Sequence, residues 1–551
     1  MYPMLLKEVK LPPDWISAMD ESRPHTQPEP TDELIGAWAV ENLTTVLAVD
    51  SQSDELSASI PSTPGQRALA EHLRSFFAGL GCATSIDQHA NVLAELPAPI
   101  THHDVPTIVL MCHLDTSKGT QAVPRLEEVP AWNGERLPYR DNSHLEVSVQ
   151  RYPALTEYLG HDILCGPGRA PIGLDNKVGM AEIMTLVQLL VGHPEFVRPP
   201  LLIVCRPDEE IGRMGAVEAL AEDLARRGVS YGFTIDGHEP FEINVENFNA
   251  SRADVTIAGQ PHPLDPARSW EALSIKLTGC KTHGATARSE GHLNSTTIFA
   301  ELVSRFADRA DLFPLSFTTT PEAETDAGMT WLVGAGTGAE KDLTTELSTI
   351  VAPHQWRGAS WQLISRQLHP GGSVADGPLR AANLLRAVLS TPGPQPLLPE
   401  DSDHFDGYSN PYSIAPGPAP GTWVVTWRLR DFSPETLRAR EEHVQRTAER
   451  LGHATAITHQ YVNMGPALRT FPHLVDLPAR AARALGEEPR VRPIRGGTGV
   501  DPFLEVSIPI ANLGTGYFGL ESEKEFTSRQ QLTRHVRWLA TLMGLCAARS
   551  A

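Results

Sequence analysis

The chain has 551 residues, a length that suits two to four domains and excludes a single small module. Its 46 Lys and Arg residues against 67 Asp and Glu residues give a formal net charge of −21 at pH 7. This negative charge disfavours nucleic acid and anionic membrane surfaces as partners, so small molecules or peptides are expected.

Cysteine usage and hydropathy indicate the compartment. The six cysteines are scattered and form neither a disulfide framework nor a CxxC metal motif. No uninterrupted apolar stretch reaches the roughly 18 residues of a membrane span, and no signal peptide is indicated. We therefore expect a protein of the reducing cytoplasm without a membrane partner.

The first elements of the chain indicate its fold class. Residues 1–38 are rich in Pro, Asp and Glu, so we expect an N-terminal extension that carries no chemistry. From Gly65, the segment GQRALAEHLRSFFAGLG places its large apolar residues on one face of a helix. Short apolar strands then alternate with helices, and this alternation predicts an α/β fold with a largely parallel sheet.

Acidic and imidazole side chains follow several of the predicted strands. His113 follows TIVLMC, Asp236 follows YGFTI, and the run LLIVC leads into the segment that holds Glu209 and Glu210. Asp175 precedes a long predicted helix. Because the carboxyl ends of strands form the ligand crevice of open α/β sheets, we expect these side chains to converge. One histidine and several carboxylates suit zinc and can share a bridging carboxylate between two ions.

The middle of the chain holds an internal repeat. The segment 274–277 and the following residues to His283 match, without gaps, the segment 360–363 and the following residues to His369. Each copy combines an apolar strand, a histidine-containing loop and a helix, and further strand and helix patterns follow. This predicts a βαββαβ unit that occurs twice.

The motifs as a set resemble those of peptidase T, a family within the aminoacylase and carboxypeptidase G type of zinc metallopeptidases. In chain order the matching segments are PSTPGQ, HLDTS, GLDNKVGMAEIM, PDEEIG, TIDG, ENFNA, RDF and PIRGGT. The resemblance implies a zinc-peptidase catalytic domain with a mostly parallel mixed sheet, interrupted by a duplicated α+β lid. It also implies hydrolysis of an amide bond in a di- or tripeptide or an N-acyl amino acid.

The resemblance suggests a division of the chain. We expect an N-terminal extension at 1–38, a catalytic domain built from 39–250 and 466–551, and two lid copies at 251–358 and 359–465. In relatives with a single lid, two subunits pair through their lids. A chain with two lid copies is therefore expected to make that pairing internally and to work as a monomer.

Matching positions imply the ligands of one or two zinc ions. His113, Asp175 and Asp236 would hold one zinc, and Asp175 would bridge to a second ion that Glu210 also binds. Asp115 would orient His113 by contacting the imidazole from the side away from the metal.

Other matching positions imply catalytic and substrate-binding roles. Glu209 would be the general base that takes a proton from water and delivers it to the leaving amine. Arg430 and Arg495 are candidates for binding a substrate carboxylate, because a guanidinium matches a carboxylate with two hydrogen bonds. His283 and His369 are the two candidates for a lid histidine that donates to the scissile carbonyl.

The sequence departs from the family at the last zinc ligand. Where peptidase T reads roughly HGKHEF, residues 521–526 read ESEKEF, which aligns Lys524 with a ligand histidine and Glu521 with an earlier histidine. A charged lysine has no lone pair and cannot bind a metal. Lys524 could replace the second zinc as a fixed charge, Glu523 could enter the coordination sphere, or hydrolysis could be lost.

These alternatives leave rival functions open. If hydrolysis is lost, the fold could serve amide formation or acyl transfer in biosynthesis, or could act as a non-catalytic binding protein. The segment PIRGGT is followed by Gly499, where the family has an aspartate, so substrate contacts near this loop are also in question.

Overall fold

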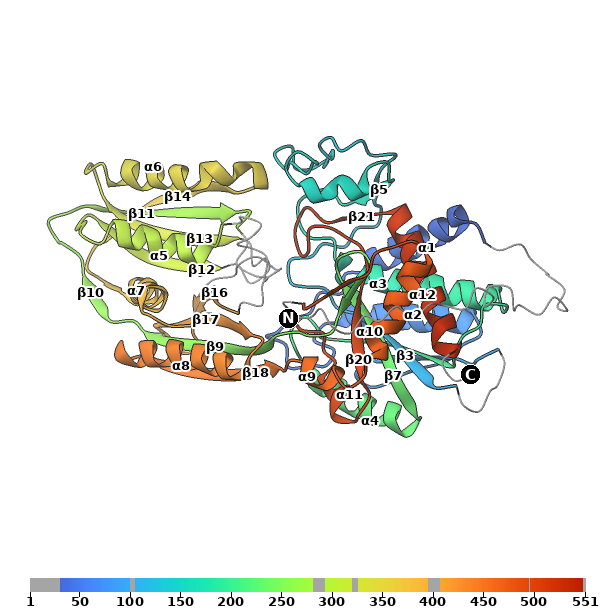
Figure 1. The fold of residues 1–551 in the computed structure, drawn as a ribbon. Coiled ribbons are helices and arrows are strands. Elements are labelled where there is room, and N and C mark those ends of the chain that lie inside the picture. Colours follow the sequence, from blue (N-terminus) through green and yellow to red (C-terminus); the bar gives the residue numbers. More distant parts are fainter. Residues whose placement is uncertain are drawn as a thin grey trace.

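The computed structural model describes residues 30–99, 105–280, 293–319, 326–394, 407–494 and 496–548. It has one large mixed sheet flanked by helices and, apart from it, two further four-stranded sheets (Figure 1). The predicted α/β class is thereby confirmed. Within the described ranges, no helix combines the length and the apolar character needed to cross a bilayer.

The large sheet and its helices form what we call the main domain. Its eight strands run in the order β1-β2-β6-β3-β7-β20-β8-β19. Their bounds are β1 (Ala83–Ile86), β2 (Val92–Leu96), β3 (Thr107–His113), β6 (Leu201–Arg206), β7 (Val229–Gly237), β8 (Glu242–Asn244), β19 (Arg490–Arg492) and β20 (Ile510–Gly514). The central strands β6, β3, β7 and β20 are parallel to one another, whereas β1 and β2 add antiparallel pairs at one edge.

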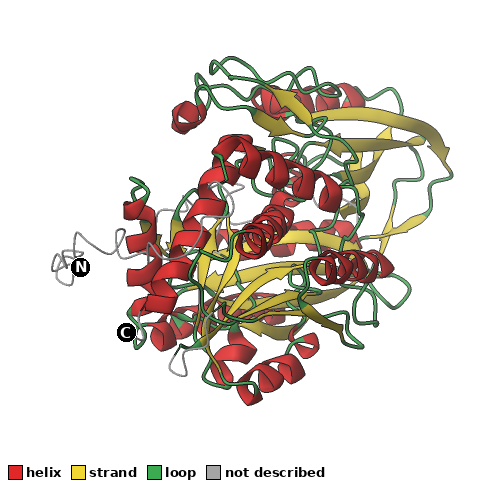
Figure 2. Cartoon of the chain, turned by 90° about the vertical axis from the view of Figure 1, so that its right-hand side faces the viewer, coloured by secondary structure: helices red, strands yellow, loops and turns green. Residues whose placement is uncertain are grey.

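Helices pack around the large sheet (Figure 2). They are α1 (Asp32–Leu47), α2 (Pro64–Gly79), α3 (Leu174–Gly192), α4 (Glu218–Arg226), α9 (Gly465–Leu468), α10 (His473–Ala484), α11 (Asp501–Glu505) and α12 (Arg529–Ala548). The helix α3 contacts β3 and β7 and is itself covered by α1 and α12, so apolar residues surround it on nearly all sides. A small sheet of β4 (Glu127–Val129), β5 (Ile163–Cys165) and β21 (Phe526–Ser528) completes the domain.

Two βαββαβ units form the lids. The inner lid consists of β11 (Trp270–Thr278), α5 (Ser295–Arg305), β12 (Leu312–Thr319), β13 (Ala327–Gly334), α6 (Ala339–Val351) and β14 (Ser360–His369). The outer lid consists of β9 (Asn249–Ala258), α7 (Gly377–Ser390), β16 (Tyr408–Pro416), β17 (Thr422–Asp431), α8 (Pro434–Arg450) and β18 (Ala454–Tyr461). Their strand orders, β12-β13-β11-β14 and β16-β17-β9-β18, correspond strand for strand.

The two lids are nested and do not follow one another as the sequence predicted. The strand β14 pairs with β11 from Trp270↔His369 to Thr278↔Ser360, so it closes the inner lid instead of opening the outer one. The outer lid begins with β9, and the whole inner lid is inserted between β9 and α7. The predicted boundary between residues 358 and 359 therefore corresponds to no boundary between the lids. Strand pairing decides the division, and two similar apolar strands do not reveal their partners.

The lids pack against each other and share one core. The helices α5 and α7 are in contact, as are the edge strands β12 and β16. At the strand contact the hydroxyls of Thr319 and Ser413 lie 3.0 Å apart. One cluster of buried apolar residues runs through both lids, from Phe299 and Trp331 in the inner lid to Trp427 in the outer lid. The pair therefore forms one body beside the main domain (Figure 1). The chain passes between the lids twice, and the two connecting segments pair as a short two-stranded sheet of β10 (Pro261–Pro263) and β15 (Ser373–Ala375).

Candidate metal centre and active site

A pocket of about 690 Å³ lies between the main domain and the lids. The main domain contributes the carboxylates predicted from the sequence, which are Asp175, Glu209, Glu210 and Asp236. The inner lid contributes Thr278, Gly279, Asp326 and Gly358, and the outer lid contributes Tyr408, Tyr412, Arg428, Arg430, Gln460 and Tyr461. A ligand in this pocket therefore contacts three parts of the chain.

Three predicted ligands converge at the floor of the pocket. His113 ends β3, Asp236 lies near the end of β7, and Asp175 lies at the start of α3. His113 Nε2 lies 3.1 Å from Asp175 Oδ1 and 3.2 Å from Asp236 Oδ1. One ligand atom from each residue falls within 4.8 Å of the other two, and among the described residues this is the one such group of His, Cys, Asp and Glu. A nitrogen and two carboxylate oxygens match the donors that zinc prefers.

The local backbone explains how Asp175 reaches this position. Gly173 has a φ of +83°, a conformation that side chains with a Cβ rarely adopt. A Cβ at Gly173 would lie 2.6 Å from Cγ2 of Thr116, so the turn also needs the space that glycine leaves. The GLD motif thus places Asp175 at the carboxyl ends of β3 and β7.

Asp115 connects the histidine to the two glutamates. His113 Nδ1 lies 2.8 Å from the backbone oxygen of Asp115 and 3.3 Å from its Oδ1. A proton on Nδ1 leaves the lone pair of Nε2 directed at the carboxylates, as metal binding requires. The carboxylate of Asp115 also accepts hydrogen bonds from the backbone N–H groups of Glu209, at 2.9 Å, and Glu210, at 3.1 Å.

The turn that presents the glutamates is anchored to the PSTPGQ segment. Asp208 has a φ of +56° and accepts hydrogen bonds from the backbone N–H of Ser62 at 2.9 Å and from Gln66 Nε2 at 2.8 Å. Gln66 in turn accepts from the N–H of Asp208 at 3.0 Å. The PSTPGQ and PDEEIG motifs, which lie far apart in the sequence, therefore form one rigid support for Glu209.

Glu209 and Glu210 have different surroundings. Glu209 Oε1 lies 3.5 Å from Nη2 of the buried Arg206. Burial raises the pKa of Glu209, and the charge of Arg206 opposes that rise. Burial, followed by the charges of Glu521 and Asp175, raises the pKa of Glu210 well above its ordinary value. Oε1 of Glu210 is buried and has no hydrogen-bond partner among the described residues. Such crowded carboxylates fit a bound cation.

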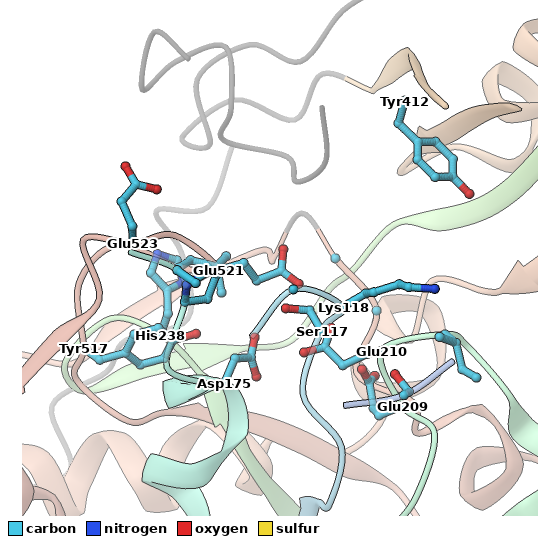
Figure 3. A pocket seen from close by; sticks show the side chains of 18 of the residues that line it. Ser117, Lys118, Asp175, Glu209, Glu210, His238, Tyr412, Tyr517, Glu521 and Glu523 are labelled. Atoms are coloured by element: carbon cyan, nitrogen blue, oxygen red, sulfur yellow. The ribbon is translucent and has the colours of Figure 1, made fainter. Parts of the chain in front are cut away.

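The structure places Lys524 beside Tyr152 and Tyr139. Its Nζ lies 5.7 Å from the ring centroid of Tyr152, and its backbone oxygen accepts a hydrogen bond from the hydroxyl of Tyr139 at 2.8 Å. Lys524 does not line the pocket, whereas Glu521 and Glu523 do. Figure 3 shows Glu521, Asp175 and Glu210 among the side chains that line this pocket. The assignment of Lys524 to the position of a metal ligand stays a prediction. The residue type was the signal that could have found Glu521, because a carboxylate is a metal ligand and an ammonium is not.

Two arginines of β17 are candidates for substrate binding, and their surroundings differ. Arg430 is buried, and its Nη1 donates to the backbone oxygens of Ser251 at 3.1 Å and Leu429 at 3.0 Å, although it also lines the pocket. Arg428, two residues earlier in β17, was missed by the sequence reasoning. It also lines the pocket, and its Cζ lies 4.1 Å from the ring centroid of Tyr412. The sequence could have indicated Arg428, because it lies two residues before Arg430 and residues two apart in a strand face the same side.

The structure describes one of the two candidate lid histidines. His369 ends β14, at the opposite end of that strand from the pocket-lining Gly358, and does not line the pocket. His283 and Arg495 lie outside the described residues.

Comparison with known proteins places the chain beside peptidases. No family model matches the sequence. Peptidase T of Bacillus subtilis (strain 168) is 26% identical over 509 residues, which cover 90% of this chain and 95% of that protein. Peptidase T of Vibrio parahaemolyticus serotype O3:K6 is 24% identical over 519 residues, which cover 92% of this chain and 98% of that protein. The resemblance to peptidase T predicted from the motifs is confirmed.

Solved structures agree on the fold. The aminopeptidase PepT from Bacillus cereus ATCC 10987 has a TM-score of 0.51 at 15% identity, over 93% of this chain and 99% of that chain. Human carnosine dipeptidase 1 has a TM-score of 0.51 at 13% identity, over 94% of this chain and 98% of that chain. The chain therefore has the fold of these peptidases.

Proposed function

Because the chain is similar to peptidase T along nearly its whole length, we propose that it is a metal-dependent hydrolase of amide bonds in short peptides. The observation that carries the proposal is the convergence of His113, Asp175 and Asp236 on one point at the floor of the pocket. The imidazole nitrogen in this set favours zinc as the metal. Biosynthetic acyl transfer and a purely binding role are not favoured, because the relatives are peptidases.

The chain's own residues supply the remaining chemistry. A metal ion held by His113, Asp175 and Asp236 would polarise the scissile carbonyl and acidify a water molecule. Glu209 accepts a proton from the water molecule as the water oxygen attacks the carbonyl carbon. It gives this proton to the amide nitrogen when the C–N bond breaks. Arg206, 3.5 Å from Glu209, and Asp115, which holds the N–H of Glu209, keep this carboxylate in position. The products are a carboxylate and an amine.

The pocket supports a small substrate. A volume of about 690 Å³ suits a di- or tripeptide or an N-acyl amino acid. We propose that Arg428 binds the substrate carboxylate, because it faces the pocket while Arg430 is held by two backbone oxygens. Arg495 remains a second candidate. All six cysteines are buried and none forms a disulfide among the described residues, which supports the reducing cytoplasm as the compartment.

The nested lids support a monomeric enzyme. The inner lid lines the pocket with Thr278 and Gly358, and the outer lid lines it with Tyr412, so one chain supplies both lid walls. We therefore propose that the paired lids replace a lid contact between two subunits. Light scattering of the purified protein should give the mass of one chain, 60.0 kDa. A dimer that loses activity when its lid contact is broken would contradict this.

Metal analysis tests the proposed function. We expect the purified protein to contain metal and to hydrolyse a tripeptide, and we expect His113→Ala to lose both the ion at this site and the activity. The matched control is His369→Ala, which removes an imidazole outside the pocket and should keep both. Full metal content in His113→Ala would exclude this site.

A further inference from the structure

We propose that Tyr517 is a further catalytic residue, whose hydroxyl donates a hydrogen bond to the oxygen of the scissile carbonyl. This inference rests on the proposed function and deepens it. Tyr517 lines the pocket between the main domain and the lids, yet its side chain is only 4% exposed. Its buried hydroxyl has no hydrogen-bond partner among the described residues. Buried tyrosine hydroxyls usually have a partner, so this one can serve a bound substrate.

The backbone fixes Tyr517 beside the strand that carries a proposed metal ligand. The segment after β20 continues along the end of β7, its neighbour in the sheet. The N–H of Thr515 donates to the backbone oxygen of Gly237 at 2.8 Å. The N–H of Tyr517 donates to the backbone oxygen of His238 at 2.9 Å. Because Gly237 and His238 directly follow Asp236, these hydrogen bonds hold the tyrosine next to the floor of the pocket.

The order of the strands places Tyr517 and Glu209 on opposite sides of the proposed metal ligands. Four neighbouring strands run in the order β6-β3-β7-β20. Glu209 follows β6, His113 ends β3, and Asp236 lies near the end of β7, whereas Tyr517 follows β20. Figure 3 shows Tyr517 and Glu209 on either side of Asp175. A carbonyl group bound above these ligands therefore has the proposed general base on one side and the phenol on the other.

The surroundings of the phenol keep its proton in place. Burial raises the pKa of Tyr517 well above its ordinary value, and the charges of four nearby carboxylates add to this rise, those of Asp175, Glu525, Asp236 and Glu521. A phenol ionises near pH 10 even in water, so the hydroxyl carries its proton at neutral pH. It can therefore donate a hydrogen bond to an oxygen of the substrate.

The hydrogen bond from Tyr517 acts on the transition state more than on the bound substrate. As the water oxygen attacks the carbonyl carbon, the carbonyl oxygen gains negative charge and becomes a stronger acceptor. A donor that is already in position then lowers the barrier without tightening substrate binding by the same amount. The sequence predicts a lid histidine as donor to this oxygen, and His369 does not line the pocket. A donor from the main domain does not depend on the lids.

The test compares Tyr517→Phe with the unaltered, metal-loaded protein on a tripeptide substrate. The variant should lower kcat by about 10²–10³-fold, as loss of a donor to the oxyanion does, while KM and metal content stay nearly the same. Its thermal midpoint should not fall, because phenylalanine removes a hydroxyl that has no partner in the fold. A phosphinic analogue of the tripeptide, in which a PO₂⁻ group replaces the scissile amide, should bind the variant more weakly by about the factor lost in kcat/KM.

Tyr152→Phe is the matched control. The hydroxyl of Tyr152 is also buried without a partner among the described residues, but Tyr152 does not line the pocket, so this variant should keep kcat and bind the analogue normally. Unchanged kcat in Tyr517→Phe would overturn the inference. A lower kcat together with lost metal or a lower thermal midpoint would also overturn it, because Tyr517 would then only support the fold. An unaltered protein that binds metal but neither cleaves peptides nor binds the analogue would overturn the proposed function as well.

Discussion

The carboxylate of Asp115 accepts a hydrogen bond from the backbone N–H of Glu209 at 2.9 Å. Its other oxygen accepts from the N–H of Glu210 at 3.1 Å, and the same side chain lies 3.3 Å from His113 Nδ1. One fully buried carboxylate thus contacts His113, the proposed metal ligand, and the backbone of Glu209, the proposed general base, and of Glu210.

Replacing Asp115 by Asn should weaken the support that this side chain gives to His113, Glu209 and Glu210. An amide retains one acceptor oxygen and adds donors, so one of the two N–H groups loses its partner. We expect metal affinity or kcat/KM to fall by about 10–100-fold, as for other residues that support metal ligands. Metal titration and steady-state kinetics check this. Asp223→Asn, on the surface of α4, should change neither quantity, and an equally active Asp115→Asn would remove the positioning role.

Replacing Glu209 by Gln should remove proton transfer and spare metal binding. The side chain keeps its shape but cannot accept a proton, so kcat should fall by about 10²–10⁴-fold while metal content stays the same. Rapid kinetics and metal analysis on one preparation give both values. The control is Glu222→Gln, at an exposed position of α4. Loss of metal in Glu209→Gln would instead make Glu209 a ligand.

Arg428 and Arg430 should respond differently to substitution by Met. Arg428→Met should raise KM by about 10–100-fold for a peptide with a free carboxylate, because a charge-assisted hydrogen bond contributes roughly 1.5–3 kcal/mol. The same peptide with an amidated C-terminus should be affected little. Arg430→Met leaves the oxygens of Ser251 and Leu429 without this donor, so it should chiefly lower the free energy of unfolding. Equal effects on the free and amidated peptides would contradict carboxylate binding by Arg428.

The buried pair of Glu182 and His535 predicts how stability depends on pH. Both side chains are fully buried, and Glu182 Oε1 lies 3.4 Å from His535 Nδ1. Burial raises the pKa of Glu182 well above 4.5 and lowers the pKa of His535 to about 3, so both groups are neutral in the fold near pH 5. Neither oxygen of Glu182 has a hydrogen-bond partner among the described residues.

The unfolded chain decides whether stability rises or falls with pH. In the unfolded chain Glu182 ionises near pH 4.5, whereas the fold keeps it protonated. Its contribution to stability is therefore complete below pH 4.5 and is lost as pH rises through the folded pKa. Glu182→Met should raise the free energy of unfolding at pH 8 by about 1–3 kcal/mol, with a smaller gain at pH 5. Urea unfolding at the two pH values, with the exposed Glu222→Met as control, measures this. A variant less stable than the unaltered protein at pH 8 would show that Glu182 is stabilising as an anion.

The sequence by itself determined the fold class and the floor of the site. Apolar strands that end in His113 and Asp236 are local patterns, and a parallel sheet brings their carboxyl ends to one edge whatever the rest of the chain does. The pairing of Asp175 with them follows for the same reason, since it begins the helix packed on those strands. Local residue types therefore sufficed to predict that these three side chains converge.

Only the tertiary structure decided the division into lids and the residues of the loop 519–525 that line the pocket. The apolar segments of β11 and β14 look alike, but hydrogen bonding between them makes them partners in one lid and nests that lid inside the other. Likewise, the Phe518–Phe526 bridge and the Glu525 contacts decide that Glu521 and not Lys524 lines the pocket. Strand partners and loop register depend on contacts between residues far apart in the chain, and no local pattern of residue types encodes them.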